Sequence, residues 1–427
     1  MLALALTCAG GISAQVIHGQ IKNCPNQWVK LAYFYGQDRL LEDSIHVEKD
    51  GHVAFTKTYP PGLYSLVIDD GEYFDLIIPK KGPAESFSTR YPEVAKNLTW
   101  TEGNENRAFT VFQNKGDQIN ELVQEGQLTP ENAQGVFASF EEGWLKENSD
   151  LDISKIIQAR NPQPKDVDIN KAFRNWTREY WKNTAVMEPG IVRSPFLQLN
   201  YAAYFDKICP QNPDTLLAVI DILYDLEMDT LVRNYLVAKM TQRFESSKIM
   251  GMDKPFVKMV DLFYKNGVAY WENEEALGKI LDKANELSWN LIGSKAPIFS
   301  FIDEKGTPRS LSQIQSPYVL LVFWDATCSH CKKTLPEVVD FYNANRSMGL
   351  EVVAITVETE LNEWRKYLAE QKLLWVNGFD NDFSKQTFRH YYYIPTTPTT
   401  LLLDSEQRIL AKNLKIADYQ QFITEQP

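Results

Sequence analysis

The sequence has no apolar run long enough to cross a membrane: the leader at residues 1–14 is too short, and no later segment is sufficiently apolar. It also has no basic surplus. Lys and Arg number 44 against 56 Asp and Glu, a formal net charge of -12 that argues against a nucleic-acid partner. A glycine-rich phosphate loop and a second closely spaced cysteine pair are both missing, which argues against a nucleotide and a structural zinc. We therefore expect an acidic globular protein without a metal, flavin or nucleotide.

The apolar leader indicates export. Residues 1–14 are mostly small and apolar, and Ala14 followed by Gln15 suits cleavage of a signal peptide, although the usual basic residues at the start are missing. A lipid anchor on Cys8 and an ordinary buried N-terminal segment are the alternatives. We expect a signal peptide at 1–14 and a location in the periplasm or cell envelope.

A chain of 427 residues is too long for one ordinary domain, and its residue pattern changes twice. Residues 15–100 contain short alternating runs between turn motifs, which predicts an all-β, sandwich-like domain. Residues 101–290 have a helical period and predict an α-helical domain. Residues 291–427 alternate strand-like and helix-like runs, which predicts an α/β domain around a central sheet. The chain is thus multidomain.

Local motifs sharpen the helical prediction. Thr129 followed by Pro130 predicts the cap and first residue of a helix, and Asn273 starts another helical run. Apolar and aromatic residues recur at helical spacing on two further stripes, and such stripes are far more often core than ligand sites. The stripes are Trp176, Tyr180 and Trp181, and Phe256, Met259, Val260 and Phe263.

The most informative feature is a pair of cysteines, Cys328 and Cys331, with two residues between them. The pair follows an apolar, strand-like run at 318–324 and precedes a helix-like run, which is the arrangement of a dithiol redox site. A helix N-terminus stabilises a thiolate, so Cys328 is the predicted nucleophile. Cys331, one turn further in, is predicted to resolve the mixed disulfide. Half of a zinc site and an inert structural disulfide are the alternatives.

Three further residues are expected to act at this dithiol. A partly cationic imidazole at His330 would lower the pKa of Cys328 and favour an oxidising couple; the alternative is an exposed histidine with little effect. Pro398 precedes a predicted strand and, if the domain is thioredoxin-like, is the candidate cis-proline; without that fold, an X-Pro bond in a loop is usually trans. A cis bond there would leave the backbone of Thr397 free to pair with an extended substrate segment.

With these motifs the last third of the chain resembles the TlpA-like thiol-disulfide oxidoreductases of the thioredoxin superfamily. The matching segments are Gly293–Phe299, Phe323–Cys331, Pro336 and Thr397–Thr399. The resemblance implies a thioredoxin-like fold, a redox-active Cys328–Cys331 disulfide in place of a cofactor, protein dithiol or disulfide substrates, and a redox partner protein. It also implies that residues near the dithiol tune it, namely Ser329, His330, Trp324 and Pro336.

The sequence departs from the family pattern at three positions. Thr327 replaces the tryptophan that many thioredoxins have before the first cysteine, and Val322 replaces their buried acid. Thr334 stands where some reducing members have a glutamate. Asp325 and Glu358 are candidate substitutes for the missing acid, although each is more simply an ordinary loop or strand-end carboxylate. These departures leave the direction of electron flow open.

Three functions follow as hypotheses. The first is a thiol-disulfide oxidoreductase of the bacterial cell envelope, and the second is an envelope binding or scaffold protein with a vestigial thioredoxin-like domain. A peroxiredoxin-like peroxidase is the third, but it needs a lone peroxidatic cysteine rather than a pair. The two other cysteines of the predicted mature chain, Cys24 and Cys209, either pair with each other or are separate buried thiols.

Overall fold

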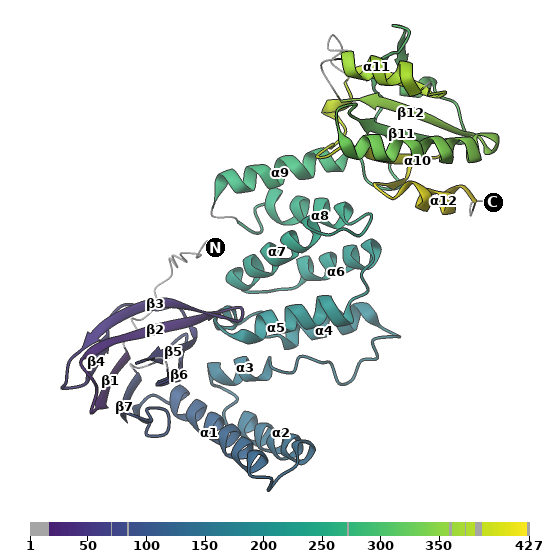
Figure 1. Cartoon of the computed structure of the whole chain (residues 1–427). Helices are drawn as coiled ribbons and strands as arrows, with labels where there is room; N and C mark the ends of the chain where they lie inside the picture. Colours follow the sequence, from purple (N-terminus) through teal and green to yellow (C-terminus); the bar gives the residue numbers. More distant parts are fainter. Residues whose placement is uncertain are drawn as a thin grey trace. The chain divides into compact units, whose positions relative to one another are not determined.

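The computed structural model describes residues 17–69, 71–82, 85–270, 273–357, 361–371, 373–380 and 387–424 (Figure 1). These residues form two compact units. The N-terminal unit contains the described residues up to Gln211 together with Asp221–Ala238, and the C-terminal unit contains Asn212–Ile220 and the described residues from Lys239 onward. The domain limits predicted at residues 100/101 and 290/291 stay predictions.

The N-terminal unit begins with strands β1–β8. Among the described residues they form two four-stranded sheets, with the orders β4-β1-β7-β8 and β3-β2-β5-β6. Neighbouring strands are antiparallel except β1 and β7, which run parallel. The bounds are β1 Ile17–Lys22, β2 Gln27–Tyr35, β3 Asp38–Val47, β4 His52–Phe55, β5 Gly62–Val67, β6 Tyr73–Ile78, β7 Glu85–Arg90 and β8 Thr99–Glu102.

The two sheets share one core, which confirms the predicted sandwich-like arrangement. On β2, Val29 and Leu31 are buried whereas Trp28 and Lys30 are exposed, as expected for side chains that alternate between the two faces of a sheet. Val29 and Leu31 belong to the same apolar cluster as Phe87 of the other sheet. This alternation explains why the short runs of the sequence form strands.

Helices follow the sheets. Their bounds in the N-terminal unit are α1 Glu105–Gln124, α2 Pro130–Glu147, α3 Asp152–Gln158, α4 Phe173–Asn183, a 3₁₀ turn at Pro189–Arg193, α5 Pro195–Ala203 and a π turn at Tyr204–Ile208. The hydroxyl of Thr129 accepts the backbone N–H of Asn132 at the start of α2, which confirms the predicted cap. The predicted α4 stripe is also core: Trp176, Tyr180 and Trp181 are all buried.

The remaining helices before the second sheet are α6 Pro213–Asp225, α7 Thr230–Glu245, α8 Asp253–Met259, a π turn at Val260–Lys265 and α9 Glu274–Ser288. Residues of α6 and α7 are divided between the two units, whereas α8 and α9 belong to the C-terminal unit. The predicted apolar face from Phe256 to Phe263 is buried. Asn273 caps α9 by accepting the N–H of Ala276, as its position predicted.

The last part of the chain is a mixed α/β fold. In the part that the structure describes, its sheet has seven strands in the order β10-β9-β13-β12-β11-β14-β15. The strands are β9 Ser300–Asp303, β10 Pro308–Ser310, β11 Tyr318–Trp324, β12 Leu350–Thr356, β13 Val376–Asp380, β14 Thr399–Leu403 and β15 Ile409–Lys412. The helices are α10 Ser329–Asn345, α11 Asn362–Gln371 and α12 Gln420–Thr424.

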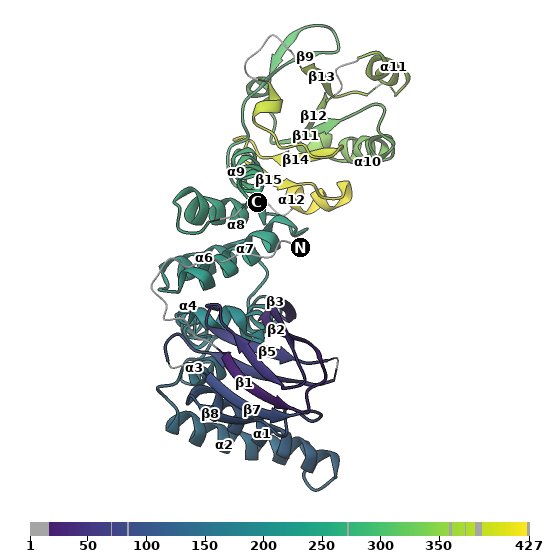
Figure 2. The same ribbon diagram turned by 90° about the vertical axis from the view of Figure 1, so that its left-hand side faces the viewer.

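Strand β11 is central and is buried on both faces, which explains its uninterrupted apolar sequence. On one face Leu320, Val322 and Trp324 pack with residues of α10 and α11, and Figure 2 shows both helices on that side of β11 and β12. On the other face Phe323 packs with Phe299 and with residues near Phe388. The sheet therefore holds the end of β11, and with it the start of α10, in a fixed position.

Candidate active site

The two cysteines lie where β11 gives way to α10. A short turn follows β11, in which the Asp325 carboxylate accepts hydrogen bonds from the backbone N–H and the hydroxyl of Thr327 at 2.6 and 2.7 Å. Cys328 is the N-cap residue of α10, and its side chain is partly exposed, whereas Cys331 is fully buried. Both thiols are free. The arrangement presents one sulfur to the surface and keeps the other beneath it.

The surroundings displace the pKa values of the two thiols in opposite directions. Hydrogen bonding lowers the pKa of Cys328; the backbone N–H of Cys331 contributes most, followed by the side-chain hydroxyl of Thr397, and the backbone N–H of His330 also contributes. Burial raises the pKa of Cys331 to about 11, although the backbone N–H of Asp325 lies 3.5 Å from its sulfur. Cys328 is therefore the more acidic and the more accessible thiol.

The dipeptide between the cysteines is at the surface. Ser329 and His330 are both exposed in the first turn of α10. The imidazole of His330 is not among the groups that lower the pKa of Cys328, whereas its backbone N–H is. Tuning by Ser329 and by the imidazole of His330 stays a prediction.

The segment before β14 reaches the dithiol. The Thr397–Pro398 peptide bond is cis, which confirms the prediction made for Pro398. The carbonyl oxygen of Thr397 lies 3.6 Å from the sulfur of Cys328, within reach of the thiol as donor. The backbone beside Pro398 is thus next to the exposed sulfur, and its pairing with a substrate segment stays a prediction.

The other predicted residues lie further from the exposed sulfur. Trp324 is fully buried, with its ring centroid 5.2 Å from that of Tyr367, and Pro336 is exposed within α10. Val322 lies in the same apolar cluster as Cys331, so an apolar side chain occupies the predicted place of the buried acid. Glu358, the second candidate acid, lies outside the described residues.

Sequence reasoning missed Tyr367 and a groove beside Thr397. Burial raises the pKa of Tyr367 on α11, and the charge of Cys331 adds to this rise, so its hydroxyl lies in the electrostatic range of the buried sulfur. The groove, of about 460 Å³, is lined by Glu286, Val357 and residues 388–389 and 392–397. These residues come from three distant segments, and no local motif brings them together.

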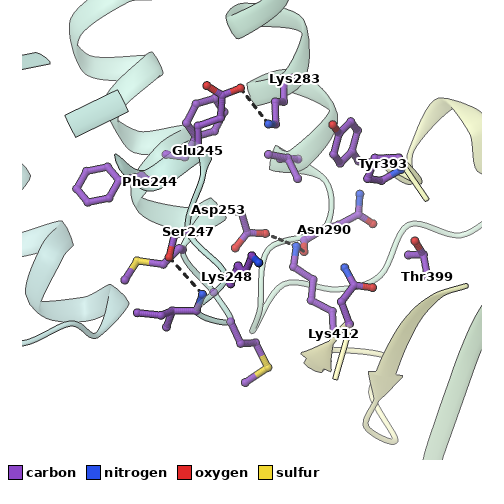
Figure 3. A pocket seen from close by; sticks show the side chains of 18 of the residues that line it. Phe244, Glu245, Ser247, Lys248, Asp253, Lys283, Asn290, Tyr393, Thr399 and Lys412 are labelled. Atoms are coloured by element: carbon purple, nitrogen blue, oxygen red, sulfur yellow. Dashed lines mark hydrogen bonds and ion pairs between the residues drawn. The ribbon is translucent and has the colours of Figure 1, made fainter. Parts of the chain in front are cut away.

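A second hollow, of about 430 Å³, lies between α8, α9 and strands β14 and β15 (Figure 3). An ion pair between Asp253 and Lys412 forms part of its lining. Lys283 forms a second pair with Glu245, at 3.0 Å. The hollow contains neither cysteine, so it is separate from the dithiol.

Cys24 and Cys209 are separate buried thiols, which decides between the two alternatives for this pair. Each sulfur approaches the carbonyl oxygen of the proline that follows it, Pro25 at 3.3 Å and Pro210 at 3.6 Å. Burial raises the pKa of Cys24, which keeps this thiol protonated at neutral pH. It therefore lacks the thiolate that exchange requires.

No group of three or more His, Cys, Asp or Glu side chains is placed to hold a metal ion within the described part of the chain. No described helix is long and apolar enough to cross a membrane. The predicted signal peptide at 1–14 and Cys8 lie outside the described residues.

Comparison with known proteins locates similarity in the region of the dithiol. A family model described as thioredoxin-like matches residues 316–409. The chain is similar to the thiol-disulfide oxidoreductase ResA of Bacillus subtilis, with 30% identity over 118 residues, which are 28% of this chain and 64% of that protein. The protein of the same name from Geobacillus kaustophilus is 26% identical over 118 residues, 28% of this chain and 66% of that protein. The chain thus spans slightly less than two thirds of the length of these two curated relatives.

Among solved structures, a domain of a possible thiol-disulfide isomerase from Cytophaga hutchinsonii is 33% identical to this chain, with a TM-score of 0.30. The match covers 32% of this chain and 92% of that domain. A thioredoxin-like protein from Bacteroides caccae is 21% identical, with a TM-score of 0.48, and the match covers 62% of this chain and 96% of that protein.

Proposed function

The C-terminal region of this chain is a thioredoxin-like domain of the thiol-disulfide oxidoreductase kind, preceded by additional sheets and helices, and we propose that it exchanges disulfides with protein substrates through Cys328 and Cys331. One observation carries the proposal. The two thiols at the start of α10 have pKa values displaced in opposite directions, and the more acidic one is accessible beside Thr397. An attacking thiolate and a protected second thiol are the two parts that exchange needs.

The reaction proceeds in two displacements. The Cys328 thiolate attacks one sulfur of a substrate disulfide, a mixed disulfide forms, and the other substrate sulfur leaves as a thiolate that takes up a proton. Cys331 then loses its proton and attacks the sulfur of Cys328, which forms the Cys328–Cys331 disulfide and releases the second substrate thiol. The substrate gains two electrons and two protons. The protein supplies both electrons and the proton of Cys331, and solvent supplies the second proton, which replaces the one that Cys328 released on forming its thiolate.

A redox partner protein with a dithiol returns the oxidised pair to the reduced state by the same steps in reverse. If the oxidised pair instead meets a substrate dithiol, it forms the substrate disulfide. The relative reduction potentials of the protein and its partners decide the direction. No cofactor is required in either direction.

Location is part of the proposal. The apolar leader at 1–14 supports export to the bacterial cell envelope, where disulfides form and persist. N-terminal sequencing of the native protein tests this: cleavage near Ala14 would support it, and an intact Met1 in a cytosolic fraction would contradict it.

Exchange itself is tested with a disulfide-linked reporter peptide and a small dithiol as electron donor. We expect the wild-type chain to accelerate reduction, Cys328→Ser to abolish the acceleration, and Cys331→Ser to accumulate a mixed disulfide with the peptide, visible by mass spectrometry. Cys24→Ser is the matched control and should retain wild-type rates, because its thiol is buried and protonated. If wild type is no faster than Cys328→Ser, the scaffold hypothesis replaces the enzyme.

A further inference from the structure

The groove beside the dithiol includes a side chain from outside the thioredoxin-like match. Its walls are residues 392–397, together with Val357, Phe388 and Arg389, and Glu286 comes from α9. The groove extends to Thr397, whose carbonyl oxygen is 3.6 Å from the sulfur of Cys328. A substrate segment bound there would therefore lie next to the exposed thiol.

Helix α9 and the residues just after it contact the segment at 391–397, of which residues 392–397 line the groove. On α9, the ammonium of Lys283 lies 6.0 Å from the centroid of the Tyr393 ring. Beyond the helix end, the ring of Trp289 packs edge-on against Tyr391 at 5.5 Å, and the Asn290 side-chain amide donates to the Tyr391 carbonyl at 2.5 Å. Residues three and four apart share a helix face, so Glu286 points the same way as Lys283.

Among the described residues that line the groove, one charge is uncompensated, and it is negative. The guanidinium of Arg389 is already engaged, because Nε pairs with the Asp380 carboxylate at 2.8 Å and Nη2 donates to the Val357 carbonyl at 2.6 Å. Glu286 is exposed and has no ion-pair partner among the residues that the structure describes. The other lining side chains are largely apolar or aromatic, including Val357, Ile394 and Pro395.

We propose that this groove binds the residues flanking the substrate's reactive disulfide, and that Glu286 selects a Lys or Arg among them. The apolar lining receives an apolar neighbour of the substrate cysteine, and the carboxylate on α9 meets a cation further along the same extended segment. The proposal rests on the proposed function and adds a substrate class to it: proteins whose exchanging cysteine has both apolar and basic neighbours. The helical extension would thus contribute directly to specificity.

The test is a series of disulfide-linked peptides that share one sequence. Each peptide carries a single Arg, placed in turn at one of the three positions on either side of the cysteine. A Gln series and a Glu series serve as references. At one or two positions we expect wild type to prefer Arg over Gln by about two- to fivefold in kcat/KM, the range of an exposed ion pair. The preference should fall as salt is raised.

Glu286→Gln should bring the ratio of kcat/KM for the Arg peptides over the Gln peptides to about one, and Glu286→Lys should transfer the preference to the Glu series. Glu275→Gln is the matched control, because Glu275 is exposed on the same helix but pairs with Lys279 away from the groove. An unchanged Arg preference in Glu286→Gln, or no Arg preference in wild type at any position, would overturn the proposal. Absence of exchange with all peptides would instead refute the function on which the proposal rests.

Discussion

Two clusters of ionisable side chains in the C-terminal unit are built in opposite ways. At the hollow of Figure 3, Lys412 and Asp253 form an ion pair with side chains only 12% and 10% exposed, and the Lys412 ammonium also donates to the Asn290 carbonyl at 2.7 Å. At the start of α10, Cys328 is partly exposed, and its sulfur faces backbone N–H groups rather than a full opposite charge.

The difference separates a structural pair from a reactive one. A buried charge that meets an opposite charge is stabilised only in that geometry, and removing either partner leaves the other without compensation. A thiolate that meets neutral N–H dipoles is stabilised enough to form but keeps a free face for attack. The position and exposure of a charge, rather than its presence alone, decide which of the two roles it has.

The largest effect should come from breaking the buried pair. Lys412→Met leaves the Asp253 carboxylate buried without its cation, a change that typically costs about 3–5 kcal/mol. We expect the lower end of this range, because the backbone N–H of Lys254 also contacts Asp253, at 3.1 Å. The free energy of unfolding can be followed in urea through labelling of the buried Cys331, which reports the C-terminal unit alone.

Two controls separate burial from charge in this experiment. Lys279→Met breaks the ion pair between Lys279 and Glu275, two side chains that are 75% and 80% exposed. It should lower the free energy of unfolding by less than about 1 kcal/mol. Combining Lys412→Met with Asp253→Leu removes both buried charges and should recover part of the loss. Equal costs for Lys412→Met and Lys279→Met would show that the pair in Figure 3 is not structural.

The second effect tests the reactive cluster. Burial raises the pKa of Cys331 to about 11, whereas hydrogen bonding lowers the pKa of Cys328, so a much larger fraction of Cys328 is thiolate at neutral pH. Lower basicity makes a thiolate a weaker nucleophile, which removes about half of that advantage on a logarithmic scale. We expect iodoacetamide to modify reduced Cys328 at least about tenfold faster than Cys331, and burial of Cys331 should widen the gap.

Peptide mass spectrometry over a pH series gives both rates. The midpoint of the Cys328 profile should lie below that of an ordinary cysteine, while Cys331 should stay slow until near pH 11. The two rates should converge in concentrated urea, where the environments are lost. A faster Cys331 in the folded protein would reverse the assignment of nucleophile and resolving thiol.

The sequence predicted the parts of the site that local patterns encode. The apolar run of β11, the cysteine spacing and the helix that follows are contiguous, and the position of Pro398 before a strand could be interpreted once that fold was assumed. The β-sheet and helical regions were likewise predicted from alternation and helical period. In each case the deciding residues are neighbours along the chain.

What the sequence did not reveal depends on tertiary contacts. Strand β13 has the sequence Val-Asn-Gly-Phe-Asp, and its Asn and Gly disfavour a strand when the sequence is considered alone. In the structure, however, any larger residue at position 378 would clash, because a Cβ there would lie 2.3 Å from the Phe301 ring. Glycine is needed there because β13 pairs closely with β9. The groove was equally hidden, since Glu286, Val357 and Thr397 lie in three separate segments of the chain.

The smallest effect concerns His330 and distinguishes its two groups. The backbone N–H of His330 lowers the pKa of Cys328 in the structure, whereas the sequence alone indicated its imidazole. His330→Gln removes the imidazole and keeps the backbone N–H. His330→Pro removes both, at a helix position where proline is tolerated because first-turn N–H groups have no partner within the helix.

Losing thiolate stabilisation raises the free energy of the reduced form, so the Cys328–Cys331 couple becomes more reducing. A one-unit rise in the pKa of Cys328 would lower the potential by about 30 mV, fully expressed only above that pKa. From midpoints in glutathione buffers we expect a smaller shift in that direction for His330→Pro, because the backbone N–H of His330 contributes least among the groups that lower the pKa of Cys328, and little change for His330→Gln. Equal shifts in both variants would assign the effect to the imidazole, and no shift in either would leave tuning to the other N–H groups and Thr397.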